Sequence, residues 1–126
     1  MAAKFEEVNP VLPVRDVRKS VRFYVDKLGF AGLFQDSEDD PHYVGVKRDA
    51  VELHLQWHDS EEWSRVERPM LRLRIEDVDR LFDEYKDKGV FHEHTQLRDT
   101  PWGTREFAFF DPDMNGLTFY RDNPSS

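Results

Sequence analysis

The chain has 126 residues, of which 38% are hydrophobic and 13% aromatic, so we expect a single folded domain over 1–126 rather than a disordered chain. Twenty-six Asp and Glu against eighteen Lys and Arg give a formal net charge of −8, which disfavours a nucleic-acid partner because it repels phosphates. The absence of cysteine excludes disulfides and thiolate ligands. No apolar run is long enough for a signal peptide or a membrane span, so we expect a cytoplasmic protein without a membrane partner.

The first half of the chain, residues 5–57, has the pattern of a βαβββ module. A strand is predicted over 11–14, and Asp16 is a good N-cap for the helix that follows. The apolar residues of that helix recur on one face, and Gly29 ends it; they are Val17, Val21, Tyr24 and Leu28. Three short strands are predicted after the helix, over 30–36, 42–47 and 50–57.

The second half, residues 69–121, repeats this pattern after a polar connector at 58–68. Val14–Val17 returns as Ile75–Val78, and Ala50–His54 parallels Gly116–Tyr120. A strand over 69–75 is followed by a helix from Asp77 to Gly89 and by strands over 91–98, 104–110 and 115–121. The predicted fold class is therefore α+β, built as tandem βαβββ modules.

Alternation along each strand separates the side chains of two faces. Leucine, valine and phenylalanine form one face, on which we also place Trp57, and this face must meet the helices. The other face is expected to be open, and it mixes charged and aromatic side chains: Glu52, His54, Gln56, Met70, Arg72, Arg74, Thr118 and Tyr120. A concave sheet surface lined this way is where a ligand is expected to bind.

Three segments carry a resemblance to a known family. Asp111–Asn115 precedes the last strand as Asp-Pro-Asp-Met-Asn, Pro101–Ala108 contains Pro-Trp-Gly, and Pro10–Val17 opens the first module. Together they resemble the glyoxalase/bleomycin-resistance superfamily (vicinal oxygen chelate fold), and specifically its bleomycin-resistance branch. The resemblance implies two curved mixed sheets that form cup-like grooves in a homodimer, with residues 1–9 exchanged between the subunits and Pro10 at the crossing point.

Enzymes of this superfamily bind a divalent metal through four strand positions, which the resemblance places at Asn9, Glu52, Met70 and Thr118. These side chains are not a metal-binding set, so we expect no metal, no cofactor and no catalytic residue. Two alternatives remain open. His92 and His94 would share a strand face and could hold zinc, although no third ligand is visible from the spacing. His54 could orient a ligand, act as a base, or form a hydrogen bond with Glu52 or Tyr120.

Aromatic residues are the strongest candidates for ligand contacts. Trp102 lies in a predicted loop, where an exposed ring suits stacking on a planar ligand, and Phe34 and Tyr43 align with aromatic positions of the bleomycin binders. The candidate ligand-binding residues are Trp102, Phe34, Tyr43, Glu52, His54, Arg72 and Tyr120. The acidic run Asp36–Asp40 would attract a cationic drug. Arg72 and Arg74 are either neutralised by Glu52 and Glu106 or select an acidic ligand instead.

The resemblance therefore implies a homodimer that confers antibiotic resistance by binding and sequestering a bleomycin-type antibiotic without chemical modification. One alternative is a metal-dependent enzyme of the same fold, a lyase, isomerase or dioxygenase with its metal at Glu52 and His54. The other is a binding module for a different small molecule.

Overall fold

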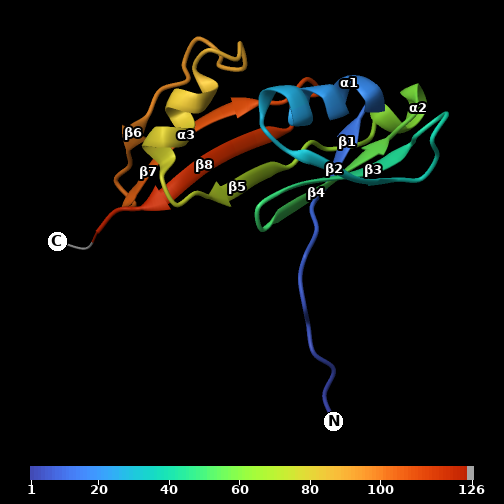
Figure 1. Ribbon diagram of the computed structural model, residues 1–126, viewed down its shortest axis with the longest axis horizontal. Coiled ribbons are helices and arrows are strands. Elements are labelled where there is room, and N and C mark those ends of the chain that lie inside the picture. Colours follow the sequence, from blue (N-terminus) through green and yellow to red (C-terminus); the bar gives the residue numbers. More distant parts are fainter. Residues whose placement is uncertain (125–126) are drawn as a thin grey trace.

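The computed structural model describes residues 1–124, so the last two residues of the domain predicted over 1–126 lie outside it. The first half of the chain forms a four-stranded sheet in the order β1-β4-β3-β2 (Figure 1). Strands β1 and β4 are parallel and the other neighbours are antiparallel. The strands are β1 (Val11–Val14), β2 (Ala31–Gln35), β3 (Tyr43–Arg48) and β4 (Val51–Trp57).

The second half forms another four-stranded sheet with the same order and directions, β5-β8-β7-β6. Its strands are β5 (Met70–Arg74), β6 (Arg98–Asp99), β7 (Thr104–Phe110) and β8 (Gly116–Asp122). The α+β class and the tandem modules predicted from the sequence are confirmed.

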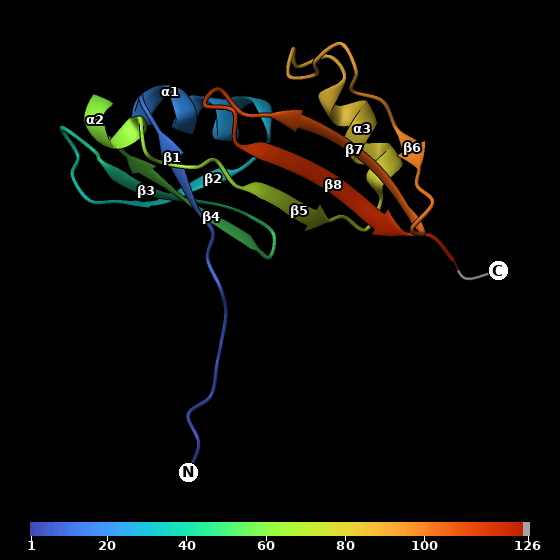
Figure 2. The same ribbon diagram turned by 180° about the vertical axis from the view of Figure 1, so that it is seen from behind.

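Each sheet carries one helical segment, and both segments begin at the predicted caps. Helix α1 (Val17–Arg22) continues as a π-helical turn, η1 (Phe23–Lys27), and its N-cap Asp16 accepts a hydrogen bond from the backbone N–H of Lys19 at 3.1 Å. Helix α3 (Val78–Tyr85) is capped in the same way by Asp77. Figures 1 and 2 show α1 and α3 on the same side of the two sheets, so the opposite sides of both sheets are left open.

The polar connector contains a short helix that the sequence analysis did not predict, α2 (Ser60–Trp63). Asp59 accepts a hydrogen bond from the backbone N–H of Glu62 at 2.8 Å, and the Glu62 carboxylate accepts one from the backbone N–H of Asp59 at 3.1 Å. This reciprocal capping box stabilises a single helical turn.

The strand predicted over 91–98 is mostly wrong, because only Arg98–Asp99 forms β6. Residues 92–95 form a turn in which the backbone N–H of Thr95 donates to the carbonyl of His92 at 3.0 Å. The Thr95 hydroxyl donates to the carbonyl of Ala108 at 2.9 Å. The Thr95 side chain therefore provides, at this edge of β7, a hydrogen bond that a neighbouring strand was expected to provide.

The apolar strand faces meet the helices as predicted, and Leu12, Leu53 and Leu55 are at most 1% exposed. Trp57 is the exception, since it is 37% exposed at the end of β4, where its ring stacks on that of His42 at a centroid distance of 4.7 Å. Its predicted place in the core is wrong, because the buried part of the sheet ends before the last residue of the strand.

Several polar contacts join the halves of the chain, and two groups of them matter most here. The first, which we call the turn junction, is buried. Asn115, in the turn between β7 and β8, donates from Nδ2 to the carbonyl of Pro13 at 3.0 Å and to the Asp111 carboxylate at 2.9 Å. Tyr24 donates from its hydroxyl to the same carboxylate at 2.8 Å. Burial raises the pKa of Asp111 above its usual value.

The second group, the hairpin junction, is half-exposed. Arg48, the last residue of β3, forms hydrogen bonds with both carboxylate oxygens of Glu84 on α3, at 2.8 and 3.0 Å. Tyr85 donates from its hydroxyl to the carbonyl of Leu28 at 2.7 Å. The hydrogen bonds from Arg48 lower the pKa of Glu84. Among residues 1–124, no helix combines the length and the apolar character needed to cross a membrane.

Candidate functional site

A chain of hydrogen bonds lies on the open face of the first sheet. The Tyr43 hydroxyl is 2.8 Å from Nδ1 of His54, and Nε2 of His54 is 2.7 Å from the Glu52 carboxylate. With a neutral imidazole, Tyr43 donates to Nδ1 and the Nε2–H donates to Glu52. Of the two hydrogen-bond partners considered for His54, Glu52 and Tyr120, the structure shows Glu52. This hydrogen bond holds the carboxylate in a fixed position, and the side chain of Glu52 is 19% exposed.

Phe34 covers this chain of hydrogen bonds from the neighbouring strand. Its ring is parallel to that of Tyr43 at 6.1 Å and perpendicular to that of His54 at 5.2 Å. The ring lies over Gly45, where a Cβ atom would overlap it. Gly45 is therefore needed so that Phe34 can lie against the sheet. The outer side of Phe34 is open, since the residue is 43% exposed.

A buried carboxylate organises the open face of the second sheet. Glu106, whose side chain is 8% exposed, accepts hydrogen bonds from the Thr104 hydroxyl at 2.8 Å and from Arg72 at 3.1 Å. Arg98 approaches the same carboxylate at 4.0 Å. The Arg72 guanidinium lies over the ring of Tyr120, 4.4 Å from its centroid.

Trp102 lies in the turn between β6 and β7 and is 60% exposed. The turn uses Gly103 at φ 89°, a left-handed conformation that favours glycine. The guanidinium of Arg98 lies 5.7 Å from the centre of the indole. A large aromatic side chain is therefore presented to solvent next to the cationic part of the second sheet.

The seven candidate residues fall into two groups. Phe34, Tyr43, Glu52 and His54 form a connected group on the first sheet. Arg72 and Tyr120 touch on the second, and Trp102 is linked to Arg72 through Arg98 and Glu106. Arg72 pairs with Glu106 and not with Glu52, whereas Arg74 is 4.0 Å from Asp122. The sequence reasoning missed Arg98. The signal for it is the strand register that sets Arg98 opposite Glu106, which is hard to read from a two-residue strand.

The four positions that the resemblance links to metal binding do not fit a divalent ion. Thr118 donates from its hydroxyl to the thioether sulfur of Met70 at 3.8 Å, and Asn9 donates to Glu7 at 3.4 Å. A thioether, a hydroxyl and an amide beside one carboxylate do not form the oxygen- and imidazole-rich set that such an ion needs.

His92 and His94 lie in the turn at 92–95, so the strand face on which the zinc alternative depended does not exist. Their ring centroids are 6.1 Å apart, and the ring of His92 accepts a hydrogen bond at Nδ1 from the backbone N–H of His94. In the part of the chain that the structure describes, no three His, Cys, Asp or Glu side chains are grouped so that they could hold a metal ion.

The fold and the open faces of the two sheets define the class of protein: paired βαβββ modules whose open sheet surfaces carry aromatic and charged side chains. The profile of the Glyoxalase/Bleomycin resistance protein/Dioxygenase superfamily matches residues 7–119. The chain belongs to this superfamily.

Within this superfamily, the chain is similar to proteins that bind antibiotics or confer resistance to them. The chain is 32% identical to a bleomycin resistance protein of Geobacillus stearothermophilus, over 89% of this chain and 93% of the relative. It resembles the crystal structure of the bleomycin-binding protein of Streptomyces verticillus in complex with copper(II)-bleomycin, with a TM-score of 0.76, 27% identity, and coverage of 98% and 100%. It also resembles TnmS3, an antibiotic-binding protein from Streptomyces sp. CB03234, with a TM-score of 0.73, 27% identity, and coverage of 99% and 100%.

Proposed function

We propose that this protein binds and sequesters a bleomycin-type antibiotic without modifying it, and so protects the cell that makes it. The observation that carries the proposal is Trp102, a large aromatic side chain that is 60% exposed in a tight turn. Such a ring suits stacking on a planar heteroaromatic ligand. The 32% identity to bleomycin resistance proteins supports this class of ligand.

The first sheet supplies a second aromatic surface for the same task. Phe34 and Tyr43 lie parallel to each other and are held in place by His54 and Gly45, so they form a rigid wall that loses little entropy when a ligand binds. Glu52 offers a fixed carboxylate beside that wall for a cationic group. Binding and charge attraction are sufficient for sequestration, which requires no bond to be made or broken.

A tryptophan-fluorescence titration with copper-loaded and metal-free bleomycin tests the proposal. We expect saturation at one drug molecule per chain, and a clearly weaker response from Trp102→Ala. Trp63→Phe is the matched control, because Trp63 contacts the guanidiniums of Arg15 and Arg68 and lines a separate hollow at the start of α1. A flat titration at micromolar drug removes the bleomycin assignment and leaves the alternative of a module that binds another small molecule.

The metal-dependent enzyme is the less favoured alternative. Both ring nitrogens of His54 are already hydrogen-bonded, so coordination of a metal by Glu52 and His54 requires the loss of at least one of these contacts. Stoichiometric metal that remains bound after dialysis, and is lost in His54→Gln, would favour that enzyme over sequestration.

We also propose that the working form is a homodimer with exchanged N-terminal arms. Residues 1–9 extend away from the body of the molecule (Figure 1), and Phe5 and Val8 are 97% and 86% exposed. Apolar side chains on an extended arm gain stability only by packing on another surface, and the open sheet face of a second copy is such a surface.

Sedimentation equilibrium tests the dimer. The full chain is expected to have the mass of two chains, and Phe5→Ser with Val8→Ser to weaken the association. The matched control, Glu6→Ser with Glu7→Ser, alters neighbouring polar positions and is expected to leave it intact. A monomer at all concentrations contradicts the dimer.

A further inference from the structure

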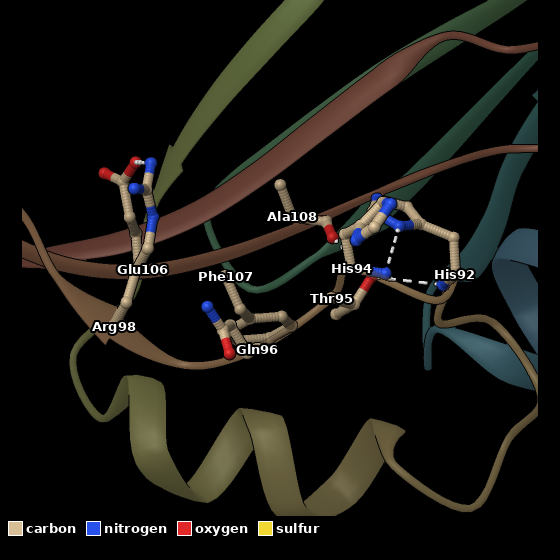
Figure 3. Close-up of a pocket in the computed structure, with 8 residues that line it drawn as sticks. All are labelled: His92, His94, Thr95, Gln96, Arg98, Glu106, Phe107 and Ala108. Atoms are coloured by element: carbon tan, nitrogen blue, oxygen red, sulfur yellow. Dashed lines mark hydrogen bonds and ion pairs between the residues drawn. The ribbon is translucent and has the colours of Figure 1, made fainter.

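The edge of the second sheet contains a small pocket that the proposed function does not use (Figure 3). It lies between the loop 92–98 and strand β7, with a volume of about 260 Å³. The pocket exists because the loop replaces the strand that the first module has at the same place. Its polar lining comes from His92, His94, Thr95, Gln96, Arg98 and Glu106.

Most of the polar groups that this pocket offers to a ligand are donors. Arg98 carries several guanidinium N–H groups, and among residues 1–124 its closest carboxylate oxygen, on Glu106, is 4.0 Å away. His92 accepts a hydrogen bond at Nδ1 from the backbone N–H of His94, so the proton of the neutral ring is on Nε2. A second guanidinium, that of Arg72, lies on the other side of Glu106.

The carboxylates nearby are already engaged. Glu106 is buried and accepts hydrogen bonds from Thr104 and Arg72. Asp99 follows Arg98 on the strand and pairs with Arg105 at 3.1 Å and with Asn123 at 3.1 Å. Glu93 is exposed and lies 3.4 Å from His94. One buried negative charge between two guanidiniums leaves a local excess of positive charge, on a chain whose formal net charge is −8.

Arg98 and Arg72 are also held in place by aromatic rings. Each guanidinium lies over a ring, Arg98 over Trp102 at 5.7 Å and Arg72 over Tyr120 at 4.4 Å. Stacking uses the flat face of a guanidinium and leaves its edge, where the N–H groups point, for a planar oxyanion.

We infer that this pocket binds the oxyanion group, a carboxylate or its equivalent, of an aromatic small molecule whose ring stacks near Trp102. This inference goes beyond the proposed function, because it names a second chemical group, an oxyanion, that this edge of the protein accepts. It assigns Arg98 to that group, Arg72 to a second positive charge on the far side of Glu106, and Glu106 to the positioning of the two guanidiniums.

Two probes of nearly the same shape but different charge test the inference: 2-naphthoate and its neutral analogue 2-naphthamide, titrated by isothermal calorimetry. Net charge alone would make the acidic protein prefer the amide. We expect the opposite, a preference of about fivefold or more for the carboxylate, because hydrogen bonds between charged groups are the stronger ones. Arg98→Gln should abolish the preference, and Arg72→Gln, which removes a positive charge from outside the pocket lining, should reduce it.

Arg65→Gln is the matched control, since it removes the same charge from an exposed side chain of the connector. Circular dichroism of each variant checks that it is folded. Equal affinity for the two probes, no binding of either, or a preference that survives Arg98→Gln overturns the inference.

The bleomycin titration separates this inference from the proposed function. If bleomycin binds and naphthoate shows no preference over the amide, sequestration stands and the oxyanion pocket is wrong. If naphthoate is preferred through Arg98 and bleomycin does not bind, the pocket stands and the antibiotic assignment falls.

Discussion

The two modules have the same backbone plan but opposite chemistry on their open faces. Across the middle of the first sheet, strand register aligns Phe34, Gly45, His54 and Val11; across the second, it aligns Arg98, Glu106, Tyr120 and Arg74. The first row is aromatic and apolar around one histidine, whereas the second is mostly charged. Duplication of one module therefore provides two surfaces with different preferences for a ligand.

One of the residue differences between the two rows shapes its surroundings in each sheet. Gly45 and Glu106 occupy matching places in the two rows: Gly45 is paired with His54, and Glu106 with Tyr120. Glycine lets Phe34 lie on the strand, and glutamate draws in Arg72 and Arg98. The absence of a side chain creates an aromatic wall in one module, and a carboxylate creates a cationic surface in the other.

The largest effect on the free energy of unfolding is expected at the turn junction, which holds the two modules together. Asn115→Ala removes two buried hydrogen bonds and leaves the carbonyl of Pro13 without its donor, so we expect a loss of about 2–4 kcal/mol in the free energy of unfolding. Arg48→Met at the half-exposed hairpin junction should cost less, because solvent screens that ion pair. Urea unfolding followed by circular dichroism measures both. If Arg48→Met is the more damaging of the two, the turn junction is not the main contact between the halves.

A smaller change tests the aromatic wall. Gly45→Ala forces Phe34 off the strand, and we expect it to cost about 1–2 kcal/mol of stability through overpacking and to weaken the response to bleomycin. Gly32→Ala on β2 is the matched control, since a Cβ atom there has nothing within 4 Å. Urea unfolding and the fluorescence titration together measure the outcome. Equal behaviour of the two variants would show that Phe34 does not depend on Gly45.

Local patterns in the sequence predicted much of this arrangement. Asp16 and Asp77 are recognisable as caps because each needs only a backbone N–H three residues away. Alternation placed Glu52 and His54 on one face, two residues apart, which made their hydrogen bond one of the alternatives for His54. These features depend on contacts within a few residues of the chain.

The failures involve contacts between distant residues. The strand over 91–98 was wrong because Thr95 bonds to Ala108 across the edge of the sheet, a contact that no local period reveals. Arg98 was missed because its role depends on its register with Glu106. Trp57 was placed in the core because alternation does not tell where the buried part of the sheet ends.

The smallest effect is a difference in pH dependence between the two junctions, which sharpens the contrast between buried and exposed contacts. The pKa of Asp111 is raised in the folded protein, so its contribution to stability is fully present below its unfolded pKa of about 3.9 and is lost as the pH rises through the folded value. The pKa of Glu84 is lowered, so its contribution is present above its unfolded pKa of about 4.3 and is lost as the pH falls through the folded value.

Asp111→Asn and Glu84→Gln should therefore change the pH profile of stability in opposite directions. Compared with Asp111→Asn, the original chain should lose stability as the pH rises. Compared with Glu84→Gln, it should lose stability as the pH falls. Urea unfolding between pH 3 and pH 7 measures both differences; the pH range is about that of carboxylate titration. Two differences with the same slope would mean that the hydrogen bonds to Asp111 outweigh its burial, and that the turn junction is held by a charged carboxylate just as the hairpin junction is.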